Sequence, residues 1–127
     1  MSDGESLDLS GRKFLVVEDD FTVGISVCHE LESFGAEIVG FCADIESSMA
    51  RIADSGGIDV AIVDLDLGGV PSTPVVDALL QRGVPTILST GYEVWSIEER
   101  FRSLPRCEKP FTRASVLRQL KALPPRA

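Results

Sequence analysis

Acidic side chains follow two of the apolar runs in this chain, and a lysine stands near its end. Glu18–Asp20 comes directly after the apolar run 14–17, and Asp64 comes directly after the run 60–63. Lys109 follows a shorter, less apolar segment. Ligands of an open parallel sheet bind at the carboxyl ends of its strands, so we predict that these side chains meet in one crevice. Carboxylates suit a divalent cation and a lysine suits phosphoryl oxygens, which is the chemistry we expect there.

Asp19 and Asp64 are the strongest candidate pair for Mg²⁺, because each follows a predicted strand. Glu18 could hold the cation directly or through water, whereas Asp20 immediately precedes a helical pattern and is predicted to cap that helix. The acidic triplet alone could equally be a solvated turn. Asp64 weakens that alternative, because an acid at the end of a buried strand needs a ligand or a partner.

Asp64 is also the candidate phosphoacceptor, because a carboxylate can attack phosphorus and form an acyl phosphate. Gly68 and Gly69 are predicted to open a flexible loop that lets the backbone approach the cation, and the backbone carbonyl of Asp66 is a candidate metal ligand. The plain alternative is that the two glycines only connect neighbouring elements.

The fourth apolar segment ends in a run of small polar residues, Ser89, Thr90 and Gly91. A hydroxyl and a backbone N–H at this strand end could bind a phosphoryl oxygen. Strands also end in hydroxyl residues without any such role. Tyr92 follows in the loop, where it is predicted to pack near the site and could gate access to Asp64.

Lys109 would face phosphoryl oxygens as a point charge. Pro110 follows it and predicts a sharp turn at that place. A surface lysine before a proline is the alternative.

Short apolar runs alternate with segments of helical periodicity along the chain. Strands are predicted at 13–17, 36–41, 58–63, 85–89 and 105–108, and helices at 21–34, 45–53, 73–81, 96–102 and 112–123. The fourth helix has a thin apolar stripe and is expected to be short or irregular. Helical crossovers imply parallel strands. We therefore predict an α/β, flavodoxin-like, doubly wound five-stranded parallel sheet in the order 2-1-3-4-5, with its switch point between the two strands that end in acids.

The chain has 127 residues, which is enough for one domain. We expect this domain over 12–123, with a disordered tail at 1–11 and a short tail at 124–127. A net charge of −8 without any basic cluster argues against nucleic-acid binding. No apolar run is long enough for a membrane span, and the acidic start is no signal peptide, so we expect a cytoplasmic protein that does not bind membranes.

Three cysteines are present, Cys28, Cys42 and Cys107, and their spacing fits neither a disulfide framework nor a zinc site. They are predicted to be small buried residues in a reducing compartment. His29 lies within the first predicted helix and is expected to be an ordinary, partly exposed histidine that donates no phosphoryl group.

Together, these motifs resemble the receiver domain of bacterial two-component response regulators. The matching segments are Phe14–Asp20, Val63–Asp64, Thr90–Gly91 and Lys109–Phe111, within a stretch from about Arg12 to Leu123. The resemblance implies that Asp64 is the phosphorylated aspartate and that Glu18 and Asp19 are the acidic pair that binds Mg²⁺.

The same resemblance implies that Thr90 is the switch hydroxyl, with Gly91 beside it, and that Lys109 contacts the phosphoryl group. It further suggests that Asp66 and Tyr92 tune how fast the acyl phosphate hydrolyses.

The chain departs from the usual family pattern in three places, one of which is the short segment from Thr90 to Lys109. Arg106 stands where the family often has an aromatic switch residue, and the loop after Asp64 lacks the usual proline. Leu67–Gly69 and Thr90–Tyr92 are similar to the stand-alone subclass nicknamed FAT GUY, which tends to have a degraded fourth helix. The Phe-Ala usual before its threonine is Leu88-Ser89 here.

The family resemblance implies a signalling module rather than an enzyme, whose only catalysis is its own phosphorylation and dephosphorylation. Its phosphodonor would be a histidine kinase or a histidine phosphotransferase, and its cofactor Mg²⁺. No output domain follows in this sequence, so we expect output through an unidentified partner protein or as a phosphate sink.

Two other functions are considered. A phosphorylation-independent scaffold, or pseudo-receiver, would bind its partner equally well after Asp64→Ala. A phosphohydrolase similar to the haloacid dehalogenases would use Asp64 as nucleophile and Asp66 as acid, and would turn over a small phosphomonoester.

Overall fold

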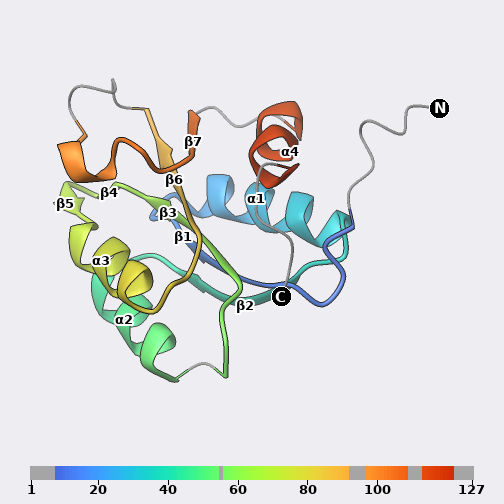
Figure 1. Cartoon of the computed structure of the whole chain (residues 1–127), viewed down its shortest axis with the longest axis horizontal. Coiled ribbons are helices and arrows are strands. Elements are labelled where there is room, and N and C mark those ends of the chain that lie inside the picture. The colour runs from blue at the N-terminus through green and yellow to red at the C-terminus, as the bar shows by residue number, and fades with distance from the viewer. Residues whose placement is uncertain (1–7, 55, 92–96, 109–112, 122–127) are drawn as a thin grey trace.

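A five-stranded parallel sheet forms the centre of the computed structural model, which describes residues 8–54, 56–91, 97–108 and 113–121 (Figure 1). Its strands are β1 (Lys13–Val17), β2 (Glu37–Cys42), β3 (Val60–Asp64), β6 (Thr86–Thr90) and β7 (Arg106–Glu108). They lie in the order β2-β1-β3-β6-β7 and pair in parallel. The predicted order 2-1-3-4-5 and the doubly wound α/β class are confirmed.

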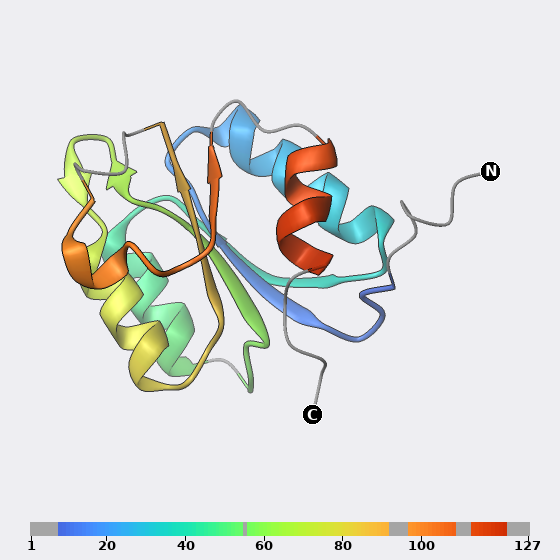
Figure 2. The ribbon, with the colours of Figure 1, turned by 45° about the horizontal axis from the view of Figure 1, so that its top comes forward.

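Helices cover both faces of the sheet (Figure 2). They are α1 (Phe21–Ser33), α2 (Ile45–Asp54), α3 (Thr73–Gln81) and α4 (Arg113–Lys121), and the described residues also include a short 3₁₀ helix, η3 (Glu99–Phe101). Helices α1 and α4 lie on one face, and α2 and α3 lie on the other. Within the described part of 96–102, only η3 is helical, in agreement with the short or irregular fourth helix that was predicted.

Alternate residues of the three central strands, β1, β3 and β6, enter two separate apolar clusters. Val16, Ile62 and Ile87 pack beneath α1 and α4. Their neighbours in sequence, Val17, Val63 and Leu88, pack beneath α2 and α3. Because both faces are covered, the central strands are apolar at nearly every position, which explains why the sequence shows apolar runs instead of alternation.

Aspartates begin the first two helices, and the sequence predicted this cap for Asp20. The Asp20 carboxylate accepts a hydrogen bond from the Val23 N–H at 3.1 Å. The Asp44 carboxylate accepts one from the Ser47 N–H at 2.7 Å, and this bond holds the pKa of Asp44 below its ordinary value. Both bonds satisfy N–H groups that a first helical turn leaves without partners.

The segment after β3 is a hairpin, whereas the sequence predicted a flexible loop. Strands β4 (Asp66–Leu67) and β5 (Val70–Pro71) pair antiparallel in a second, two-stranded sheet. Gly68 and Gly69 form its turn with φ values of 66° and 93°. Two-residue hairpin turns favour such values, and glycine reaches them without steric cost, so the two glycines specify a turn.

The packed part of the chain begins earlier than the predicted boundary at Arg12. Leu9 is only 2% exposed, lies in the cluster beneath α1 and α4, and donates its N–H to the Phe34 carbonyl at 2.8 Å. One apolar residue in a polar stretch is a weak signal, which is why it was predicted as tail. Residues 1–7 and 122–127, which include the rest of both predicted tails, lie outside the described residues.

All three cysteines are free and buried, as predicted. Burial raises the pKa of Cys28 and that of Cys107 to about 11, because it disfavours the thiolate. His29 is exposed on α1. Within the described part of the chain, no helix has the length and apolar character that crossing a membrane requires.

Candidate functional site

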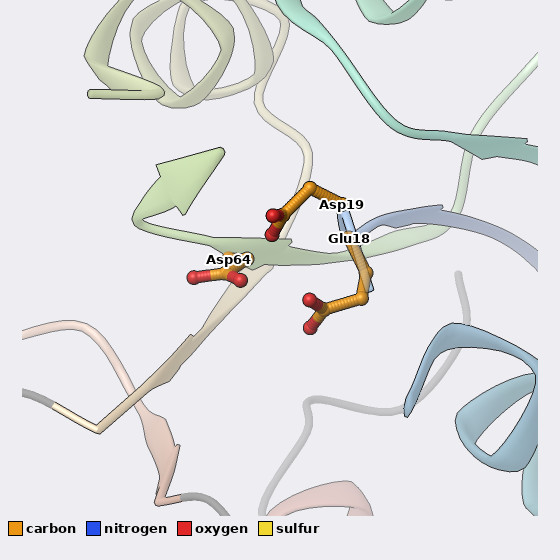
Figure 3. Close-up of side chains that lie close together, drawn as sticks. All are labelled: Glu18, Asp19 and Asp64. Atoms are coloured by element: carbon orange, nitrogen blue, oxygen red, sulfur yellow. The ribbon is translucent and has the colours of Figure 1, made fainter. Parts of the chain in front are cut away.

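Three carboxylates converge where β1 and β3 end (Figure 3). Asp64 is the last residue of β3, and Glu18 and Asp19 follow β1 directly. One carboxylate oxygen of each residue lies within 4.8 Å of the others. The structure therefore brings together the three acids that the sequence predicted as metal ligands.

The pairing of β1 with β3 places these acids at the same level of the sheet. Val17 is the register partner of Val63, so the next residues, Glu18 and Asp64, leave the two strands side by side. On its other side β1 pairs with β2, so the next two strands of the chain, β2 and β3, lie on opposite sides of β1. This is the switch point at which sheets of this type bind ligands.

Burying these negative charges costs folding free energy unless a positive charge compensates them. Glu18 and Asp64 are 3% and 4% exposed, whereas Asp19 is exposed and leaves the group open to solvent. Oxygens bound to octahedral Mg²⁺ lie about 2.1 Å from the ion and therefore about 3–4 Å from one another. An all-oxygen, negatively charged donor set with an open side fits a hard divalent cation.

Backbone N–H groups hold two of these carboxylates in place. The Asp66 N–H donates to Oδ1 of Asp64 at 3.0 Å, and the Asp20 N–H donates to Oε2 of Glu18 at 3.1 Å. In each case the donor is the backbone N–H of the residue two positions later, so each carboxylate is fixed relative to its own strand. The site is therefore preorganised before any ligand binds.

Ser72 is a supporting residue that the sequence analysis missed. It is fully buried, and its hydroxyl donates to the backbone carbonyl of Asp64 at 2.6 Å. Its N–H donates to the Leu65 carbonyl at 3.0 Å. Ser72 thus ties the start of α3 to the end of β3. A serine just before a helix suggests an ordinary cap, so the sequence holds no separate signal for this contact.

The hairpin lies against the acidic group on the Asp19 side. A Cβ atom built on Gly68 would be 3.7 Å from Oδ2 of Asp19. The Asp66 side chain is not part of the group, because its carboxylate accepts the Gly69 N–H at 2.8 Å within the hairpin. A dehalogenase-type phosphohydrolase would need this acid to protonate a leaving group, and the geometry gives that alternative no support.

The predicted phosphoryl-binding hydroxyl lies at the same edge of the sheet. Asp64 is the register partner of Ser89 on β6, and Thr90 ends that strand one residue later, 2% exposed. Gly91 follows and is exposed. Tyr92 and Lys109 lie outside the described residues, so their predicted roles stay predictions.

Solved structures match the chain, although no protein-family model and no curated protein sequence matches it at a strict threshold. SdrG from Sphingomonas melonis Fr1 is 36% identical over 96% of this chain and 98% of its own, with a TM-score of 0.78. The BeF₃-activated conformation of SdrG from Pseudomonas melonis Fr1 is 37% identical over 87% of this chain and 93% of its own, with a TM-score of 0.76.

A more distant neighbour has the same fold. The REC domain of the PhyR response regulator from Erythrobacter litoralis is 22% identical over 94% of this chain and 98% of its own, with a TM-score of 0.76. At that identity the similarity concerns the fold alone.

Proposed function

The chain belongs to the receiver-domain family of response regulators, and from this premise we propose that it is a phosphorylation-dependent signalling module. Its phosphodonor would be a histidine kinase or a histidine phosphotransferase, and Asp64 would accept the phosphoryl group. The observation that carries the proposal is the convergence of the Glu18, Asp19 and Asp64 carboxylates within 4.8 Å of one another at the switch point.

In the proposed transfer, a carboxylate oxygen of Asp64 attacks the phosphorus of a phosphohistidine. An O–P bond forms as the N–P bond breaks, and the imidazole nitrogen keeps the electron pair and takes up a proton. Attack of water on the acyl phosphate later releases inorganic phosphate and restores the carboxylate. The N–H of Asp66, 3.0 Å from Oδ1 of Asp64, orients the nucleophile before the transfer.

Mg²⁺ is the cofactor that the acidic group fits. Glu18, Asp19 and Asp64 would hold it, with the backbone carbonyl of Asp66 as a further candidate ligand. When bound, the cation would neutralise charge on the phosphoryl oxygens.

The remaining predicted residues complete this proposal. The Thr90 hydroxyl and the Gly91 N–H would bind phosphoryl oxygens, and Lys109 would add a positive charge beside them. Tyr92 and Asp66 would tune the lifetime of the acyl phosphate. Output would pass through contact with a partner protein, or the domain would act as a phosphate sink in the cytoplasm.

Intact mass spectrometry after incubation with acetyl phosphate tests the proposal. We expect one Mg²⁺-dependent phosphoryl adduct on the wild type and none on Asp64→Asn. Asp54→Asn, at the exposed end of α2, is the matched control and should keep the adduct. An adduct that survives in Asp64→Asn, or that forms equally well in a chelator, would contradict the proposed role of Asp64 or of the cation.

A further inference from the structure

The hydroxyl of Ser89 is buried without a hydrogen-bond partner in the part of the chain that the structure describes. The residue is 2% exposed, so bulk water does not replace the missing partner. Most buried polar side-chain atoms have a partner, so an exception needs an explanation, and a role in a functional site is one such explanation.

The position of Ser89 in the sheet relates it to the acidic group. It is the register partner of Asp64, and its carbonyl accepts the Leu65 N–H at 3.2 Å. Two residues earlier, the partners Ile62 and Ile87 both face the cluster beneath α1 and α4. Side chains two apart on a strand share a face, so Ser89 and Asp64 lie on this same face.

Other buried hydroxyls in the described part of the molecule have partners. Ser48 donates to the Asp44 carbonyl at 2.6 Å, Ser72 to the Asp64 carbonyl at 2.6 Å, and Thr86 to the Val84 carbonyl at 3.0 Å. Thr86 lies at the opposite end of the same strand, β6. On β6, the Thr86 hydroxyl, away from the site, has a partner, whereas the Ser89 hydroxyl, beside Asp64, has none among the described residues.

We propose that Ser89 is a positioning residue for Asp64, whose hydroxyl donates a hydrogen bond to the Asp64 carboxyl group once a cation and a phosphoryl group occupy the site. This inference rests on the proposed function. A serine hydroxyl reaches a new acceptor by rotation about one bond. Because the bond would exist only in the occupied state, it would shift the equilibrium toward that state.

The proposal predicts opposite effects of Ser89→Ala on stability and on ligand binding. Removing a buried hydroxyl that has no partner should leave the melting temperature of the free protein unchanged or raise it. The same change should weaken Mg²⁺-dependent binding of beryllofluoride, a phosphoryl mimic, by about tenfold, the value of one hydrogen bond. A residue with a merely structural role would not produce these opposite effects.

The experiment measures the affinity for beryllofluoride by ¹⁹F NMR and the melting temperature without ligand. Thr86→Val is the matched control, because it removes a partnered hydroxyl from the same strand. It should lower the melting temperature and leave the affinity unchanged. Ser89→Thr keeps a hydroxyl, so its affinity for beryllofluoride should lie within about threefold of the wild-type value. That change is smaller than the loss of about tenfold expected for Ser89→Ala.

Two results would overturn the inference alone: an unchanged affinity in Ser89→Ala, or a lower melting temperature of that variant, which would place the hydroxyl in a bond already present in the free protein. If the wild type itself neither binds beryllofluoride with Mg²⁺ nor forms the phosphoryl adduct, the proposed function fails and the role of Ser89 fails with it.

Discussion

The carboxyl edge of the sheet has two differently built halves. The acidic half consists of the ends of β1 and β3 with the hairpin β4–β5. The hydroxyl half consists of the ends of β6 and β7 with η3. In the acidic half, backbone N–H groups hold the Glu18 and Asp64 carboxylates, and Ser72 ties down the end of β3. In the hydroxyl half, the side-chain hydroxyl of Ser89 has no hydrogen-bond partner in the described part of the chain.

The short helix η3, which belongs to the hydroxyl half, is also attached by few contacts in the described part of the molecule. Within the described residues, η3 is held by the buried ring of Phe101 and by an exposed ion pair between Arg100 and Asp77 of α3. A pocket of about 470 Å³ lies between η3 and the hairpin, lined by residues of both halves. Backbone N–H groups thus fix the charged part of the site in advance, whereas the Ser89 hydroxyl can still turn toward a ligand.

Phe101→Ala should have the largest effect on this arrangement. Phe101 is 2% exposed, and truncating a buried phenylalanine costs about 3–5 kcal/mol of unfolding free energy. Urea denaturation measures the loss. Phe21→Ala is the control, because the same truncation at a side chain that is 71% exposed should cost less than about 1 kcal/mol. Equal losses in the two variants would show that η3 does not depend on its buried ring.

Mg²⁺ should stabilise the acidic half and thereby the whole fold. At a concentration of about 100 times its Kd, a ligand that binds only the native state adds about 2.7 kcal/mol. Thermal melts with and without Mg²⁺ should show this gain in the wild type and lose it in Asp19→Asn. Without Mg²⁺, Asp19→Asn should be at least as stable as wild type, because it removes a charge from three clustered carboxylates.

Asp66→Asn provides the control for the cation experiment. It keeps the backbone carbonyl and an acceptor for the Gly69 N–H, and its side chain is outside the acidic group. The response to Mg²⁺ should therefore survive. A melt of the wild type that does not respond to millimolar Mg²⁺ would contradict the proposed metal site.

Variants of Asp20 should distinguish helix capping from metal binding within the acidic half. Asp20→Ala removes the bond to the Val23 N–H and should cost about 1 kcal/mol, while Asp20→Ser keeps an acceptor and should restore most of it. Both variants should respond to Mg²⁺ as the wild type does. If Asp20→Ser instead abolished that response, Asp20 would be a metal ligand and its assignment as a cap would be incomplete.

The acidic half could be predicted from the sequence, because its signals are local. A carboxylate after each of two apolar runs, with the parallel order of the strands, was enough to bring Glu18, Asp19 and Asp64 together. The cap of α1 followed from an equally local pattern, and the strand order followed from the alternation of strands and helices along the chain. The hairpin was missed because Gly68-Gly69 indicates a turn only once the short flanking segments are known to pair.

The contacts that the sequence could not predict are those between distant side chains. Ser72 reaches the Asp64 carbonyl, and Arg100 reaches Asp77, across segments whose spacing carries no signal. The unpartnered hydroxyl of Ser89 depends on packing of the whole strand end. Residues of the hydroxyl half acquire their roles from tertiary structure, which is why the prediction was weaker there.

The Asp77–Arg100 ion pair should give the smallest effect, and its dependence on pH identifies it. Hydrogen bonding to Arg100 holds the pKa of Asp77 below its ordinary value. A carboxyl with a lowered pKa in the folded state stabilises the protein above its ordinary pKa, and this stabilisation is lost as the pH falls through the folded-state value. Asp77→Asn should therefore melt slightly below wild type at neutral pH, and the difference should disappear in acid.

Two comparisons make this small effect interpretable. High salt should reduce the neutral-pH difference, because the side chains of Arg100 and Asp77 are 50% and 39% exposed and the pair is screened. Glu99→Gln removes an exposed charge from η3 that makes no ion pair in the described part of the chain, and should show no such pH dependence. If Asp77→Asn and Glu99→Gln behaved alike at every pH, the ion pair would not hold η3, and Phe101 would be its main attachment among the described residues.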